Sequence, residues 1–343
     1  MFSGCGGMDL GFKGGFTFLG KRYEALPFKI IWANDINKYA CMTYRHNLKE
    51  DIFCGDVWDY IHTMPSSADV IIGGFPCQDI SVNNGKGQGI KGARSGLYKA
   101  IVQAIINVRP RIFIVENVKG LLMRKNQQSL EKVISDFGAL GYKLAYQLYQ
   151  AASYGVPQSR ERVLIVGTLP GPHEFSPPPA ILDECEWVTA SEAIQDLEGM
   201  PENQQNNHIW SRANKSPEQG NRRLDPNKPG YTIRAECHGN IQFHYNLSRR
   251  ISMREAARLQ SFPDDFIFQA KLRETERQVG NAVPPLLAWH MANSVKQYLI
   301  NTSWQCSAKK RPNPWGKLCP EVATRYRTRN DYSVTNARRS AFY

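Results

Sequence analysis

The sequence predicts an α/β fold, a doubly wound and mainly parallel sheet joined to a smaller, loop-rich domain. Short apolar runs alternate with segments of helical periodicity up to about residue 169, a pattern typical of a sheet covered by helices on both faces. A region rich in Asn, Gln, Gly and Pro follows, and regular patterning returns near residue 252. The length of 343 residues is enough for about two domains.

The expected elements follow in order along the chain. Apolar runs predict strands at 30–33, 69–72, 111–115, 142–149 and 162–166, and periodicity predicts helices at 37–46, 97–108 and 129–140. Ser252 and Glu255 form a capping-box pattern that opens a further helix. A last helix is expected from Pro284 to about Leu299.

Charge is unevenly distributed along the chain. Lys and Arg number 43 against 31 Asp and Glu, a net charge of +12 that favours nucleic acid over a membrane as partner. Residues 183–202 carry seven acids and no Lys or Arg, whereas 203–250 carry eight basic residues against three acids. The tail at 301–343 has nine basic residues against two acids. It fits either a disordered, solubilising extension or a nonspecific DNA clamp.

Composition also excludes several classes of protein. Mean hydropathy is −0.45, and no apolar run approaches the ~20 residues of a membrane span. The N-terminus lacks the basic and apolar regions of a signal peptide. The eight cysteines form no Cys-x-x-Cys pair, so we expect reduced thiols and neither a disulfide framework nor a metal site. A nucleophilic cysteine remains open.

The sequence Gly-Gly-Phe-Pro-Cys at 73–77 follows a predicted strand, at the sheet edge where ligands bind in open α/β folds. A lone cysteine there is more simply explained as a buried structural residue. However, the glycine-rich stretch at 80–96 carries Lys86, Lys91 and Arg94, which suits a lid over an anionic substrate. Cys77 is therefore a candidate nucleophile.

Two other strand ends carry candidate catalytic groups. Glu116 ends the strand at 111–115, where a carboxylate either lies on the surface or serves the same crevice as Cys77. Arg160 and Arg162 alternate before the next strand, so both should point to one side and could hold an anion or a carbonyl oxygen. A surface ion pair with Glu161 is the alternative explanation.

The sequence Phe-Ser-Gly-Cys-Gly-Gly at 2–7 resembles a nucleotide-binding turn, although Asp9 stands where GxGxxG has its third glycine. Asp35 is suitably placed to bind a ribose diol, and Asp56 to bind an adenine amino group. Each of these acids could also be an ordinary loop residue. No Walker A sequence is present, which disfavours ATP chemistry.

In order and spacing, these segments resemble the DNA (cytosine-5) methyltransferases of bacterial restriction-modification systems. The resemblance extends from Phe2 to about Leu299 and rests on six segments: 2–7, 74–78, 116–118, 158–162, 254–263 and 278–284. It implies a Rossmann-like sheet that binds S-adenosylmethionine (AdoMet). The implied domains are a catalytic domain at 1–169 and 250–300, a target recognition domain at 170–249, and the basic tail at 301–343.

The resemblance also implies the roles of individual residues. Cys77 would attack C6 of a flipped-out cytosine in duplex DNA, Glu116 would bind N3 and the 4-amino group, and Arg162 with Arg160 would hold O2. The expected cofactor-binding residues are Phe2, Gly4, Cys5, Gly6, Gly7, Asp35, Ile36, Asp56, Val57, Pro76, Leu97, Asn281 and Val283. The expected DNA-binding residues are Ser81, Lys86, Lys91, Arg94, Thr232 and Arg234.

We further expect a monomer in the bacterial cytoplasm, associated with the nucleoid, with a cognate restriction endonuclease that acts separately. The family's first strand normally precedes Phe2, whereas here only Met1 does, which points to a mis-called start or a truncated chain. Asp35 also replaces a frequent Glu. Three rival hypotheses are an RNA cytosine-5 methyltransferase, a catalytically inactive DNA-binding protein and, on the glycine-rich turn alone, a nicotinamide dehydrogenase. The recognition sequence cannot be derived from these residues.

Overall fold

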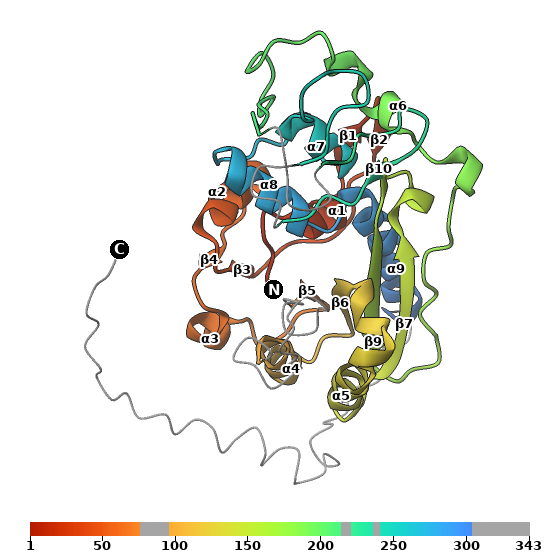
Figure 1. Cartoon of the computed structure of the whole chain (residues 1–343). Helices are drawn as coiled ribbons and strands as arrows, with labels where there is room; N and C mark the ends of the chain where they lie inside the picture. The colour runs from red at the N-terminus through yellow and green to blue at the C-terminus, as the bar shows by residue number, and fades with distance from the viewer. Residues whose placement is uncertain (76–95, 214–220, 236–240, 304–343) are drawn as a thin grey trace. The chain divides into compact units, whose positions relative to one another are not determined.

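The computed structural model describes residues 1–75, 96–213, 221–235 and 241–303 (Figure 1). Its strands are β1 Phe16–Phe18, β2 Lys21–Tyr23, β3 Asn34–Asp35, β4 Phe53–Cys54, β5 Val70–Gly74, β6 Ile112–Val118, β7 Lys143–Gln150, β8 Gln158–Ser159, β9 Glu161–Thr168 and β10 Gly230–Tyr231. Its α-helices are α1 Gly7–Lys13, α2 Lys38–Leu48, α3 Val57–Tyr60, α4 Leu97–Val108, α5 Gln127–Gly138, α6 Ala190–Ile194, α7 Met253–Leu259, α8 Leu272–Asn281 and α9 Pro285–Ser303.

The central sheet has four strands in the order β5-β6-β9-β7. β5 and β6 pair in parallel, but β9 is antiparallel to both β6 and β7. The predicted α/β class is therefore confirmed, whereas the expectation of a mainly parallel sheet is wrong for this sheet. β3 and β4 form a separate parallel pair within the described residues.

Helices cover both faces of the sheet, as the continuously apolar strands predict. On one face, Ile112 and Ile114 of β6 belong to a buried cluster with Leu287 and Met291 of α9. On the other face, the ring of Phe113 packs on Phe137 of α5, with centroids 5.1 Å apart. The alternation of side chains along a strand sends these neighbours in opposite directions.

Most predicted elements are confirmed within a few residues, and α4 has the predicted bounds. Ser252 caps α7 in the predicted capping box with Glu255. The strand predicted at 30–33 is wrong, because only the next two residues, in β3, pair with another strand. An apolar run becomes a strand only where a neighbour completes its ladder.

The region at 170–249 has few regular elements among its described residues, namely α6, β10 and short 3₁₀ turns. Ile194, Leu224, Ile233 and Ile241 nevertheless share a buried cluster with Leu259 of α7. The loop-rich segment therefore has an apolar core that it shares with the helices that follow it.

Candidate active site

The carboxyl ends of β5 and β6 lie side by side and bring Glu116 over Gly74. These two residues are partners in the parallel ladder. A Cβ atom built on Gly74 would lie 2.8 Å from Oε2 of Glu116, closer than such contacts occur. Glycine at position 74 therefore makes room for the Glu116 carboxylate at the end of the strand.

The chain that leads from β5 toward Cys77 is held at Phe75. Asn117, of which only 1% is exposed, donates from Nδ2 to the Phe75 carbonyl at 3.2 Å. The Phe75 ring lies against Tyr98 of α4. Pro76 and Cys77 themselves lie outside the described residues, as do Ser81, Lys86, Lys91 and Arg94.

Arg162 faces Glu116 from the neighbouring strand. It lies opposite Val118 in the antiparallel β6–β9 ladder, and its Nε lies 2.8 Å from Oε1 of Glu116. Both side chains are largely buried. Burial raises the pKa of Glu116, and the positive charge of Arg162 acts in the opposite direction. A carboxyl group under these two influences can exchange a proton with a bound base.

The terminal nitrogens of Arg160 have different partners from those of Arg162. Its Nη1 donates to the Ile233 carbonyl at 2.9 Å, and its Nη2 donates to the carbonyls of Gly280 and Ala282 at 2.7 and 3.0 Å. The residue as a whole is 1% exposed. The terminal nitrogens of Arg160 thus bind backbone carbonyls, while its charge, like that of Arg162, acts to lower the pKa of Glu116. That the two arginines share one target stays a prediction.

The segment that contains Thr232 and Arg234 lies beside the strand end that carries Arg160. β10 pairs in parallel with β8, and Thr232 Oγ1 donates to the Ser159 carbonyl at 2.6 Å. A Cβ on Gly280 would lie 2.4 Å from the Ala235 nitrogen. Glycine at position 280 therefore allows this segment to pack directly on α8, and Arg234 is exposed at its surface.

The glycine-rich segment at the N-terminus adopts unusual backbone conformations. Phe2, Gly4 and Gly6 have φ angles of 53°, 56° and 94°, the left-handed region that is costly for a side chain such as that of Phe2. A Cβ on Gly4 would meet nothing within 4 Å. One on Gly7 would lie 2.5 Å from the Val283 carbonyl, so Gly7 serves close packing whereas Gly4 borders open space.

Asp35 ties the same segment to the end of β3. Its two carboxylate oxygens accept from the backbone N–H groups of Gly4 at 2.7 Å and Asn37 at 2.8 Å. Beyond it, Ile36 is 73% exposed, unusually high for a large apolar side chain. The β3–β4 ladder brings Asp56 to the same edge, where its carboxylate caps α3 by accepting from the Trp58 nitrogen.

The other predicted cofactor residues differ in exposure. Cys5 and Val57 are 2% exposed and Val283 is 9% exposed, so their side chains face the interior. Leu97 is half-buried at the start of α4, and Asn281 is exposed at the end of α8. Cys5 lies against the Gln278 carbonyl, which brings the first and last of the six segments together.

The structure adds three residues to this site, of which Asn117 alone carries a signal in the sequence. Asn117 follows Glu116 in the chain. A polar residue inside an apolar strand indicates a buried hydrogen bond and is therefore a candidate for a role in the site. Trp58 is 45% exposed, and its backbone nitrogen donates to Asp56 at 3.0 Å. Gln158 is fully buried, accepts from the Ile233 nitrogen and donates to Gln260.

Two absences concern only the part of the chain that the structure describes. No group of three or more His, Cys, Asp or Glu side chains there could hold a metal ion. No helix among these residues is long and apolar enough to cross a membrane.

The α/β fold, with a glycine-rich segment tied to β3 and a buried carboxyl group near the end of β6, is that of a Rossmann-like methyltransferase. Residues 1–297 match the C-5 cytosine-specific DNA methylases. The chain belongs to this family and is a DNA (cytosine-5)-methyltransferase. Membership implies dependence on AdoMet.

Individual relatives agree with this assignment. The chain is 36% identical over 332 residues to the type II methyltransferase M.NgoFVII of Neisseria gonorrhoeae, covering 86% of this chain and 85% of that protein. It is 33% identical over 329 residues to M.BbvI of Brevibacillus brevis, with 83% and 86% covered. The structure of the Entamoeba histolytica methyltransferase EhMeth matches the fold with a TM-score of 0.61 at 16% identity, covering 87% of this chain and 97% of that one.

Proposed function

We propose that the chain methylates cytosine in a specific duplex DNA sequence through a covalent bond between Cys77 and C6 of a flipped-out base. The position of Glu116 is the observation that carries this proposal. Its carboxyl group lies over Gly74 and faces Arg162. Gly74 stands three residues before Cys77 in the chain. A cytosine reached by Cys77 would then have its Watson–Crick edge near Glu116.

The thiolate of Cys77 adds to C6, and the electron pair of the C5–C6 double bond moves to C5. Glu116 supports this step by donating a proton toward N3 and accepting a hydrogen bond from the 4-amino group. Bound AdoMet supplies the electrophilic methyl group that C5 takes. A base then removes the C5 proton, the C5–C6 double bond re-forms and the C6–sulfur bond breaks, which releases Cys77. The proton donated toward N3 returns to Glu116, so that both groups are restored.

Arg162 and Arg160 have different roles in this proposal. Arg162 orients Glu116 and holds the cytosine O2, to which a guanidinium group can donate. Arg160 is a positioning residue, because its contacts to Ile233, Gly280 and Ala282 support the segment that presents Thr232 to the DNA.

The residues at the ends of β3 and β4 fit AdoMet. Gly4 borders open space, and Ser3 Oγ is buried without a hydrogen-bond partner among the described residues. Ile36 offers an exposed apolar surface. We assign the adenine to Phe2, Ile36 and Asp56, the ribose hydroxyls to Asp35, and the methionine part to the Gly4–Gly7 turn. The remaining pocket residues are Val57, Pro76, Leu97, Asn281 and Val283.

In this proposal the segment at 170–249 recognises the DNA sequence, and its Thr232 and Arg234 lie near the flipped base. The other DNA-binding residues belong to the expected lid and are Ser81, Lys86, Lys91 and Arg94. The tail at 301–343 contributes charge without sequence preference. The relatives are type II methyltransferases, so we also propose a cognate restriction endonuclease that acts separately. The enzyme would act as a monomer in the bacterial cytoplasm, near the nucleoid.

The test uses duplex DNA with 5-fluorocytosine at the target and AdoMet present. Fluorine cannot leave C5 as a cation, so the Cys77–C6 bond should persist through denaturation, and peptide mass spectrometry should locate it. Cys77→Ser should abolish the adduct, whereas Cys185→Ser, at an exposed cysteine, should form it normally. Attachment at another cysteine, or trapping on RNA but not on DNA, would overturn the proposal.

A further inference from the structure

Two cysteines that take no part in the proposed methyl transfer lie together next to Asp35. Cys41 belongs to α2 and is fully buried, whereas Cys54 ends β4 and is partly exposed. Both are free thiols, and the two side chains are close enough to be hydrogen-bond partners. A pair of neighbouring thiols, one of them accessible from solvent, is a candidate site of oxidation.

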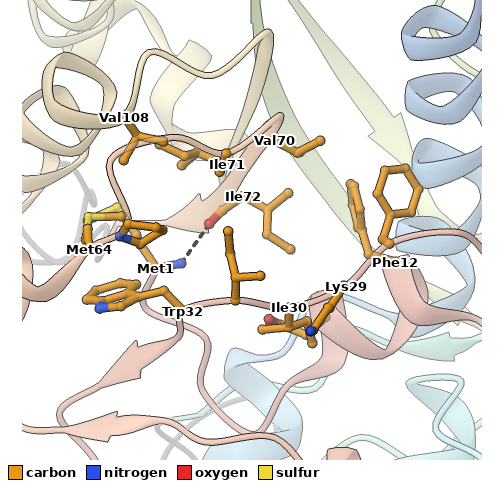
Figure 2. Close-up of a pocket in the computed structure, with 15 residues that line it drawn as sticks. Met1, Phe12, Lys29, Ile30, Trp32, Met64, Val70, Ile71, Ile72 and Val108 are labelled. Carbon is orange, nitrogen blue, oxygen red and sulfur yellow. Dashed lines mark hydrogen bonds between the residues drawn. The ribbon is translucent and has the colours of Figure 1, made fainter.

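The geometry of β4 directs Cys54 toward Cys41. Successive side chains of a strand point to opposite faces, and Ile52 and Cys54 both pack in the apolar cluster that contains Cys41 of α2. Phe53, between them, faces the other way and packs on Trp32 of the segment that leads into β3 (Figure 2), with ring centroids 5.9 Å apart. Contacts on both faces of β4 therefore hold the Cys54 thiol on the side of α2.

Both cysteines also contact the backbone of Asp35. Cys41 Sγ donates to the Asp35 carbonyl at 3.4 Å, and Cys54 is the partner of Asp35 in the parallel β3–β4 ladder. The carboxylate of Asp35 accepts from the N–H groups of Gly4 and Asn37. A covalent change at the two thiols would therefore act directly on the segment to which we assign AdoMet.

We propose that Cys41 and Cys54 form a redox-sensitive dithiol, which a hydroperoxide oxidises to a disulfide that weakens AdoMet binding. Formation of the bond is independent of the enzyme's chemistry, whereas its effect rests on the proposed role of Asp35. The two sulfurs of a disulfide are about 2.05 Å apart, closer than two thiols in contact, so α2 and β4 must shift. The bond also removes the S–H group that donates to the Asp35 carbonyl.

The oxidation takes two steps, written here for hydrogen peroxide. Cys54 attacks one oxygen of the peroxide, the O–O bond breaks, and the products are a sulfenic acid and one water. The Cys41 sulfur then attacks the Cys54 sulfur, the S–O bond breaks, and the hydroxyl group leaves as a second water with the Cys41 proton. Two electrons pass from the thiols to the peroxide. Burial raises the pKa of Cys41, so Cys54 is the thiol that reacts first.

The experiment treats the reduced full-length protein with a slight excess of hydrogen peroxide. Peptide mass spectrometry without reduction should find the Cys41 and Cys54 peptides joined, with two hydrogen atoms fewer than their sum. Equilibrium dialysis should show AdoMet affinity reduced by about tenfold, comparable to the loss of one hydrogen bond. Dithiothreitol should restore both the free thiols and the affinity.

Matched variants separate this pair from the other cysteines. Cys54→Ser cannot form the bond and should bind AdoMet equally well before and after peroxide treatment. Cys185→Ser removes an exposed cysteine elsewhere and should respond to peroxide as the wild type does. Cys41→Ala removes the same bond from the side of α2, so the test remains available if Cys54→Ser does not fold.

Three results would overturn the proposal. The first is an oxidised protein in which Cys41 and Cys54 stay free or pair with other cysteines. The second is a Cys41–Cys54 disulfide that leaves AdoMet affinity unchanged. The third is an equal loss of affinity in Cys54→Ser, which would assign the effect to another thiol such as Cys77. Reduced protein that fails to bind AdoMet would instead contradict the proposed cofactor site, and the peptide map would still decide whether the disulfide forms.

Discussion

The strands around Glu116 and the loop-rich segment at 170–249 hold their backbone in place by different means. Glu116 and Arg162 stand on neighbouring strands, in register through a continuous ladder. Where the loop-rich segment at 170–249 packs on the residues that follow it, fully buried arginines replace the ladder. Arg250 donates to the carbonyls of Ala213 and Ile241, and Arg254 to those of Asn206, Pro263 and Phe266.

The difference shows how a loop-rich domain can be both irregular and ordered. Buried carbonyl groups need donors, and one guanidinium group can serve several that no strand reaches. The consequence is an unequal sensitivity to substitution. A ladder survives the loss of one side chain, whereas the loop carbonyls depend on a single residue such as Arg160. The following predictions test this contrast.

The largest effect is expected at the ladder-held catalytic group. Glu116→Gln should reduce the methyl-transfer rate by about 10²–10⁴-fold, because an amide cannot pass a proton to N3. Folding and DNA affinity should change little. Glu161→Gln is the matched control, since its carboxylate pairs with Lys119 at the surface. A Glu116→Gln enzyme with normal single-turnover rates would remove this residue from the mechanism.

Substitution of Arg160 should mainly lower stability, whereas substitution of Arg162 should mainly lower activity. Arg160→Met leaves the buried carbonyls of Ile233, Gly280 and Ala282 without this donor and should cost about 3 kcal/mol of unfolding free energy. Arg162→Met should lose most of its activity but be destabilised less than Arg160→Met, because Glu116, whose pKa burial raises, can take up a proton when its partner is removed. Urea denaturation and single-turnover assays on both variants measure this. Equal destabilisation by both would contradict the contrast.

The sequence predicted the ladder region far better than the region held by arginines. Periodicity and apolar runs are local signals, so α4 and β6 could be found from their own residues. The prediction of a strand at 30–33 was wrong because an apolar run forms a strand only when a neighbouring strand pairs with it. The role of Arg160 could not be derived from the sequence because its acceptors lie 73 to 122 positions away in the chain. Only the folded structure brings these residues together.

A smaller effect is expected where the segment that contains Arg234 and Ala235 packs on α8. Gly280→Ala places a Cβ 2.4 Å from the Ala235 nitrogen, so backbone must move, at a cost of about 1–3 kcal/mol. DNA affinity should fall with it, because Thr232 and Arg234 belong to the displaced segment. Gly199→Ala is the control, since its Cβ would meet nothing within 4 Å. Similar melting and DNA binding for both variants would show that this packing is not required.

The smallest effect concerns pH and again involves Glu116, whose pKa is raised mainly by burial. A carboxyl group with a raised folded-state pKa stabilises the protein below its unfolded pKa, and this contribution is lost as pH rises through the folded value. Glu116→Gln imitates the neutral form at every pH. The variant should therefore gain stability relative to the wild type as pH increases from about 4.5 toward neutrality. Urea unfolding across this range measures the difference, with Glu161→Gln as control. A difference that stays constant with pH would show that Arg162 offsets the whole effect of burial.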